Sequence, residues 1–167
     1  SMGVATLPGH AATIATVNVG SAENPASDVD LLLSSNCTLT TINQYGGKVE
    51  CNAALTTWTV GRGDAEINGT GAITTLTIEE SPDGSTIKHN GSGTITALNI
   101  GPGATVDFSG VKTAITITNC TIAPGGCLKD PGKRVTFSNA FTLSRHGLDT
   151  FAKAGGDLGS NIAIQRS

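Results

Sequence analysis

Five charged residues occupy equivalent positions in short segments that share one pattern. In most of these segments the charged residue stands between two apolar residues, and the segment closes on a turn residue. If the segments are stacked strands, neighbouring charges lie about 5 Å apart. Glu50 and Glu66 would then have the carboxyl separation of a retaining glycosidase. The five residues are Glu50, Glu66, Lys88, Asp107 and Lys129.

A solvated ladder of alternating charges explains the same five residues without catalysis, and we favour it. Two of the five are lysines, which separate or follow the carboxylates. A sugar site also needs aromatic platforms beside a groove. The single tryptophan, Trp58, instead falls at a position that we expect to point into the core. We therefore predict no catalytic residues.

Asparagines follow the charged positions at one corner of the pattern. The corner is occupied by Asn52, Asn68 and Asn90, and then by Ser109 and Asp130. A row of amides can line a binding edge. Asn also tolerates the left-handed backbone of turns and hydrogen bonds to turn backbone. We expect a hydrogen-bonded ladder that stabilises the turns.

The histidines and cysteines lack the spacing of metal ligands. His89 falls at an inward position, which favours a packed ring, and His10 and His146 are far from it in sequence. The cysteines form no CxxC pair or other usual zinc arrangement. They are Cys37, Cys51, Cys120 and Cys127. We predict no metal and no cofactor.

Two of the cysteines fall at inward positions of the repeat. At such positions Cys51 and Cys120 would act as small apolar side chains, so we expect buried free thiols. A Cys120–Cys127 disulfide stays open as an alternative, because an oxidising compartment would permit it.

Two surface motifs match short consensus patterns. Arg62-Gly63-Asp64 has the form of an integrin ligand on a turn, which suggests a surface adhesin as a weaker, third option. Asn-x-Ser/Thr sequons begin at Asn36, Asn68, Asn90 and Asn119. A Thr-rich repeat with Asn at its corners produces sequons by chance, and we see no secretion signal, so we expect no glycosylation.

A six-residue pattern must position all of these side chains. Residues 73–78 and 95–100 have apolar residues at positions one, four and six, and mostly small polar residues between them. Copies occur at 14–19, 39–44, 55–60 and 117–122, with a weaker one at 138–143. Their fourth positions are separated by 25, 16, 18, 22, 22 and 21 residues. A period near 20 indicates stacked supersecondary units.

Each unit also contains a second short strand. These strands begin near residues 49, 65, 87, 106 and 127, and no helical period accompanies them. The pattern predicts an all-β, right-handed parallel β-helix of about six to seven irregular coils without substantial helix. Residues 1–12 would be a lead-in, 13–143 the coils, and 144–167 a C-terminal cap.

Composition agrees with a thin coil stack. Of 167 residues, 38% are apolar and 4% aromatic, and 22 are glycine. A net charge of -3 gives no electrostatic reason to expect nucleic acid or an anionic membrane as a partner.

The order of several segments resembles β-helical repeat proteins of tailed bacteriophages and prophages. The resemblance covers roughly residues 13–165. It is carried by residues 37–47 (CTLTTINQYGG), 71–76 (GAITTL), 106–109 (VDFS), 118–122 (TNCTI), 130–136 (DPGKRVT) and 157–159 (DLG).

This resemblance implies a non-enzymatic structural protein of the virion, such as a capsid decoration or fibre. The expected partners are capsid or other virion proteins and further copies of the chain, with a homotrimer favoured. The expected location is the virion, assembled in the cytoplasm of the bacterial host. The alternative function is a tailspike-like β-helix that binds or cleaves a glycan.

Overall fold

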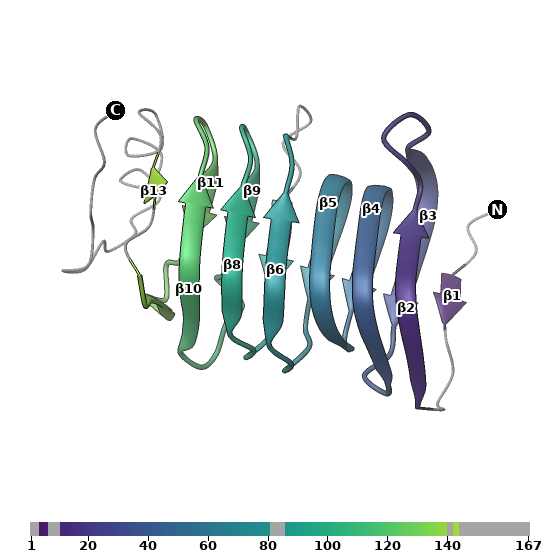
Figure 1. Ribbon diagram of the computed structural model, residues 1–167, viewed down its shortest axis with the longest axis horizontal. Coiled ribbons are helices and arrows are strands. Elements are labelled where there is room, and N and C mark those ends of the chain that lie inside the picture. Colours follow the sequence, from purple (N-terminus) through teal and green to yellow (C-terminus); the bar gives the residue numbers. More distant parts are fainter. Residues whose placement is uncertain (1–3, 7–10, 81–85, 140–141, 144–167) are drawn as a thin grey trace.

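The computed structural model describes residues 4–6, 11–80, 86–139 and 142–143, and these ranges are all-β without a helix (Figure 1). The predicted cap, 144–167, lies outside them. The strands are β1 (Val4–Thr6), β2 (Ala12–Val19), β3 (Ala26–Leu33), β4 (Cys37–Cys51), β5 (Ala54–Ile67), β6 (Ile73–Ile78), β7 (Thr86–His89), β8 (Ile95–Ile100), β9 (Thr105–Asp107), β10 (Ile115–Ile122), β11 (Cys127–Lys129), β12 (Val135–Phe137) and β13 (Thr142–Leu143).

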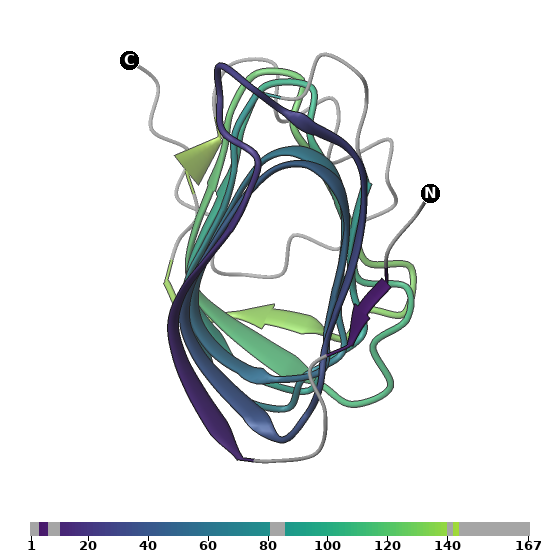
Figure 2. The same ribbon diagram turned by 90° about the vertical axis from the view of Figure 1, so that its right-hand side faces the viewer.

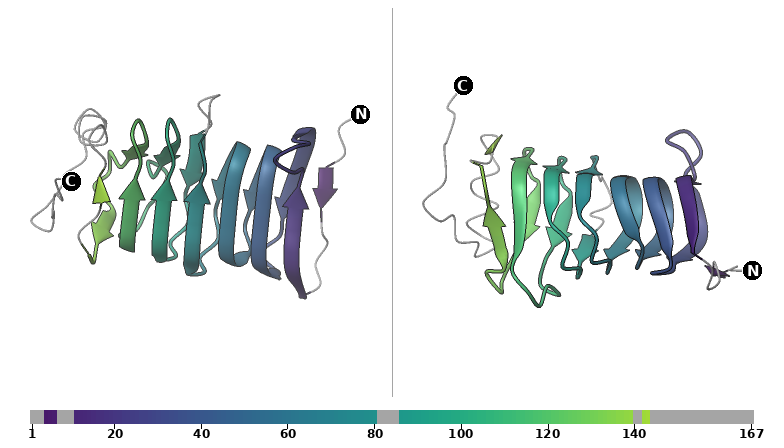
Figure 3. Two further views of the ribbon diagram at one scale, coloured as in Figure 1. Left: turned by 45° about the horizontal axis from the view of Figure 1, so that its top comes forward. Right: turned by 60° about the horizontal axis from the view of Figure 1, so that its bottom comes forward.

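The strands form a parallel β-helix, as predicted. One sheet stacks β2, β4, β5, β6, β8 and β10, and the other contains β3, β7, β9, β11 and the ends of β4 and β5. In Figure 1 the first sheet runs upward in front and the chain returns behind it while advancing towards the C-terminal end, so the coil is right-handed. The stack makes about five turns, slightly fewer than predicted (Figure 3).

The observed register is the one that the spacing predicts. The fourth positions of the repeat pair from coil to coil, beginning with Val17, Ile42 and Trp58 and ending with Leu98 and Cys120. β6 and β8 have the predicted bounds, 73–78 and 95–100. The weakest copy is only partly confirmed, because the described part of 138–143 contains just the short β13, which pairs with β10.

The chain forms one strand inside the predicted lead-in. β1 pairs in parallel with β3 through Val4 opposite Asp30, Ala5 opposite Leu31 and Thr6 opposite Leu32. Part of residues 1–12 therefore extends the second sheet by one strand.

The interior of the coil is filled by one continuous aliphatic core. Seen end-on, the two sheets and their connections surround it (Figure 2). The largest fully buried side chains are Trp58 and Phe108, and most of the others are Ile and Leu. Each coil buries its side chains mainly against the coils on either side, because the pairing brings equivalent positions together.

Two coils turn their corner without breaking the strand. β4 and β5 are 15 and 14 residues long and bend from the first sheet into the second. Gly46, Gly47 and Gly63 have positive φ at this bend, a conformation that glycine adopts readily. The buried Gln44 supports the bend, because its Nε2 atom lies 2.9 Å from the Asp64 carbonyl and 3.4 and 3.3 Å from those of Gly46 and Gly47.

Removing one core side chain should destabilise the stack strongly. Leu98 is fully buried and pairs with Leu76 and Cys120. We expect Leu98→Ala to lower the free energy of unfolding by about 2–5 kcal/mol, since it leaves a cavity. Urea unfolding followed by circular dichroism measures this, with the exposed Ser92→Ala as control. Equal midpoints for the two variants would contradict this packing.

Candidate functional site

The predicted charge ladder lies on the outer surface of the second sheet. Glu50 pairs with Glu66, Glu66 with Lys88, Lys88 with Asp107, and Asp107 with Lys129. A second column beside it pairs Asp30 with Lys48 and Lys48 with Asp64. We call this surface the charged face, and its eight residues are Asp30, Lys48, Glu50, Asp64, Glu66, Lys88, Asp107 and Lys129.

The corner asparagines and the acidic ladder form one hydrogen-bonded network. Asn68 Nδ2 donates to Glu50 Oε1 over 3.2 Å, and Asn90 Nδ2 donates to Glu66 Oε1 over 2.9 Å. Asn90 Nδ2 also lies 3.0 Å from Asn68 Oδ1. Each amide therefore holds a carboxylate of the preceding coil. The sequence indicates both rows but not the contacts between them.

The basic rungs stabilise the ionised form of Asp107. Partial burial acts to raise the pKa of this carboxyl. Hydrogen bonds from Ser109 and the charges of Lys129 and Lys88 act in the opposite direction, and the net effect holds the pKa below its usual value. Asp107 is therefore a stable anion between two lysines, which is the arrangement of a structural ladder.

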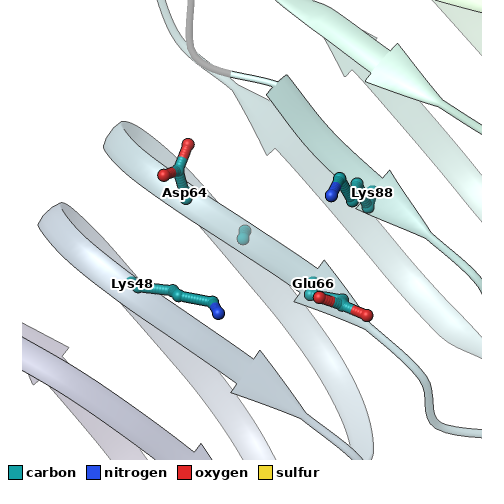
Figure 4. Close-up of a pocket in the computed structure, with 5 residues that line it drawn as sticks. Lys48, Asp64, Glu66 and Lys88 are labelled. Atoms are coloured by element: carbon teal, nitrogen blue, oxygen red, sulfur yellow. The ribbon is translucent and has the colours of Figure 1, made fainter.

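The charged face has two shallow depressions. The larger, about 250 Å³, is lined by Lys48, Asp64, Ala65, Glu66 and Lys88 (Figure 4). The smaller, about 180 Å³, adjoins it and is lined by Asp30, Leu31, Leu32, Lys48 and Glu50. Both are lined by charges of both signs and contain no aromatic side chain. Trp58 is fully buried, as predicted, so it offers no platform to a sugar.

Asp130 continues the corner row in sequence, but the structure turns it into the core. Its side chain is 6% exposed. Oδ1 accepts a hydrogen bond from the Arg134 backbone N–H over 3.0 Å, and Oδ2 accepts one from Val135 over 2.8 Å. Asp130 therefore anchors the turn that leads into β12, which is the turn-stabilising role predicted for the corner row, although its carboxylate is buried.

The cysteines behave as core residues. All four are free, and Cys37, Cys51 and Cys120 are buried, which confirms the inward positions predicted for Cys51 and Cys120. The structure contains no Cys120–Cys127 bridge. Burial raises the pKa of Cys51 to about 11 and that of Cys120 to about 12. Both thiols therefore stay protonated and are poor nucleophiles at neutral pH.

His89 is buried, as its inward position predicts. It is 1% exposed, and its ring centroid lies 5.2 Å from that of Phe108. Neither ring nitrogen has a hydrogen-bond partner, and burial lowers the pKa of the ring to about 4. A neutral ring without access to solvent is unsuited to acid–base catalysis. His10 and His146 lie outside the described residues.

The short surface motifs are parts of the coil. Arg62-Gly63-Asp64 lies within β5, at the bend where Gly63 has positive φ, and pairs with β4. The sequon residues Asn68 and Asn90 are half-buried in the amide–carboxylate network.

Among the residues that the structure describes, no three His, Cys, Asp or Glu side chains are grouped as metal ligands. Within the same ranges no helix has the length and apolar character needed to span a bilayer.

The opposite side of the coil carries a second extended surface that sequence reasoning did not single out. The outward residues of β2, β4, β5, β6, β8 and β10 at repeat positions two, three and five are almost all threonine or asparagine. We call them the threonine face. They are Ala15, Thr16, Asn18, Thr40, Thr41, Asn43, Thr56, Thr57, Thr59, Thr74, Thr75, Thr77, Thr96, Ala97, Asn99, Thr118, Asn119 and Thr121.

Burial of His89 should make the stability depend on pH. Above pH 6.5 the ring is neutral in the folded and the unfolded chain and adds no pH dependence. Below 6.5 the unfolded chain binds a proton that the folded chain excludes until about pH 4. The free energy of unfolding should therefore fall across this window, by about 3 kcal/mol in total.

Comparing wild type with His89→Leu isolates this effect, because the carboxylates and the other histidines are the same in both proteins. Urea unfolding at pH 7, 5.5 and 4.5 should show wild type losing stability relative to the variant. If the difference in the free energy of unfolding between the two proteins stayed constant over this range, His89 would have the same pKa in the folded and the unfolded chain.

No protein-family model, curated protein or solved structure matches the chain. A function for this chain therefore has to be inferred from the charged face, the threonine face and the fold that positions them.

Proposed function

We propose that the chain is a non-enzymatic structural module of a tailed-phage virion, of the capsid-decoration or fibre type. The observation that supports this best is the continuous parallel register from β2 to β10. It connects every coil to the next through backbone hydrogen bonds and leaves two extended outer surfaces. A stiff rod of this kind suits an assembled particle, in which many weak contacts act together.

The chemistry of the charged face also favours a structural role. Three of its acidic residues have partners, since Asn68 and Asn90 bind Glu50 and Glu66 and two lysines flank Asp107. A glycosidase uses one carboxylic acid to protonate the leaving group and a second carboxylate as base or nucleophile. Here both glutamates already accept amide hydrogen bonds that link successive coils.

The partners of this module would be capsid or other virion proteins and further copies of the chain, with a trimer as the favoured assembly. The resemblance to phage β-helical proteins motivates this part of the proposal. The module would be assembled into the virion in the cytoplasm of the bacterial host.

The first experiment measures the molar mass of the purified protein by light scattering. The protein is then mixed with particles of the encoding phage that were produced without it, and the mixture is sedimented. We expect a defined oligomer that co-sediments with the particles and protects them during heating. A chain that sediments separately from such particles at every concentration tested would contradict the virion role.

The second experiment tests the alternative, a glycan-cleaving β-helix. Because Glu50 and Glu66 have structural partners, we expect no glycan cleavage by wild type. Glu50→Gln and Glu66→Gln should each change the free energy of unfolding by about 1 kcal/mol or less, since glutamine still accepts a hydrogen bond. Cleavage of host surface polysaccharide by wild type that either variant abolishes would instead establish an enzyme.

A further inference from the structure

The strand segments of the threonine face carry no charged residue. Residues 12–19, 37–44, 54–60, 72–78, 94–100 and 115–122 contain none of the 23 Lys, Arg, Asp and Glu residues of the chain, 10 basic and 13 acidic. The charged face, built from the same coils, carries eight of them. Threonine favours strands in general, but this does not account for a complete absence of charge. Depletion of charge marks the core of protein interfaces.

The face is also rigid and regular before it meets a partner. Its rows repeat at the strand spacing, about 4.8 Å, because the strands pair in register. Threonine is restricted at χ1. Side chains also hold one another, since Asn43 Nδ2 donates to Asn18 Oδ1 over 2.9 Å and Asn99 Nδ2 donates to Thr77 Oγ1 over 3.3 Å. Little conformational entropy would be lost on binding.

The chemistry of the face is complementary to itself. Each threonine hydroxyl and each asparagine amide can both donate and accept a hydrogen bond. Two such faces can therefore satisfy each other without burying an unpaired charge. They also share one repeat spacing, so a contact made at one coil can recur at the next. Self-complementarity is what a symmetric contact between identical subunits requires.

The size of the face fits a subunit contact. Six strands about 4.8 Å apart, each presenting about six residues of 3.3 Å, cover roughly 30 by 20 Å, or about 600 Å². A standard interface buries about 800 Å² per partner, with a lower limit near 600 Å². Full coverage of the face therefore reaches the range of a stable, specific contact.

We propose that the threonine face is the surface through which copies of this chain associate. This proposal rests on the oligomeric structural module proposed above. In a dimer two faces pack against each other. In a trimer three faces turn towards a common axis. In both arrangements the charged face, on the other side of the coil, stays at the outside of the rod.

A lysine placed on the face tests this directly. The two face variants are Thr75→Lys and Thr74→Lys. Thr75 lies at the centre of the face and is half-buried on β6. Thr74 beside it is exposed, so Thr74→Lys is the variant less able to disturb folding. Thr105→Lys on the opposite sheet is the matched control, since Thr105 is also half-buried on a short strand. Circular dichroism shows whether each variant keeps the β-helix.

Analytical ultracentrifugation then compares the four proteins over a concentration series. We expect an oligomer for wild type and Thr105→Lys, and self-association weakened at least about tenfold for Thr74→Lys and Thr75→Lys, because like charges would be buried together. A monomeric wild type, or an oligomer that neither face variant weakens, would overturn the inference.

Particle binding separates this inference from the proposed function. If the chain binds phage particles but is monomeric, or assembles through another surface, the proposed role of the threonine face is contradicted and the virion role is not. An oligomer that the face variants dissociate, but that ignores particles, would support the face and contradict the virion role.

Discussion

The parallel, in-register pairing of successive coils is the constraint on which the rest of the structure depends. It places Ile42 against Trp58 and Leu76 against Leu98 inside the coil, and it places Glu50 against Glu66 outside it. Equivalent positions of successive coils therefore lie one strand spacing apart. The aliphatic core, the charged face and the threonine face are three sets of columns produced by the same pairing.

Because this constraint is visible in the spacing of residues, the sequence predicts the stack well. Strands 73–78 and 95–100, the inward Trp58 and His89, and the order of the charged rungs all agree with it. The bends of β4 and β5 could not be predicted in this way. Gly46 and Gly47 are residues that normally end a strand, but here the strand continues through them. The bend is supported by Gln44 Nε2, which reaches the Asp64 carbonyl on the next coil.

The candidate site was less predictable, because its contacts cross from one coil to another. Register alone places Asn68 beside Asn90 and Glu50 beside Glu66. Only side-chain geometry shows that Asn68 reaches Glu50, 18 residues away, which turns two separate rows into one network. For Asp130 the row predicts a side chain that stabilises a turn, and its carboxylate does bind two backbone N–H groups, but only the structure shows that this carboxylate is buried.

A surface made of columns also explains why no catalytic motif stands out in this chain. A motif concentrates chemistry in a few residues at fixed spacing, whereas a column spreads it over every coil. Changing one rung of the threonine face, such as Thr75, leaves Thr57 below it and Ala97 above it in place. In the proposed contact, affinity would then come from many small contacts that act together, so a charge placed on the face should matter more than the loss of any single hydroxyl. The distribution of charge between the two sheets is therefore the observation on which the proposed self-association depends most.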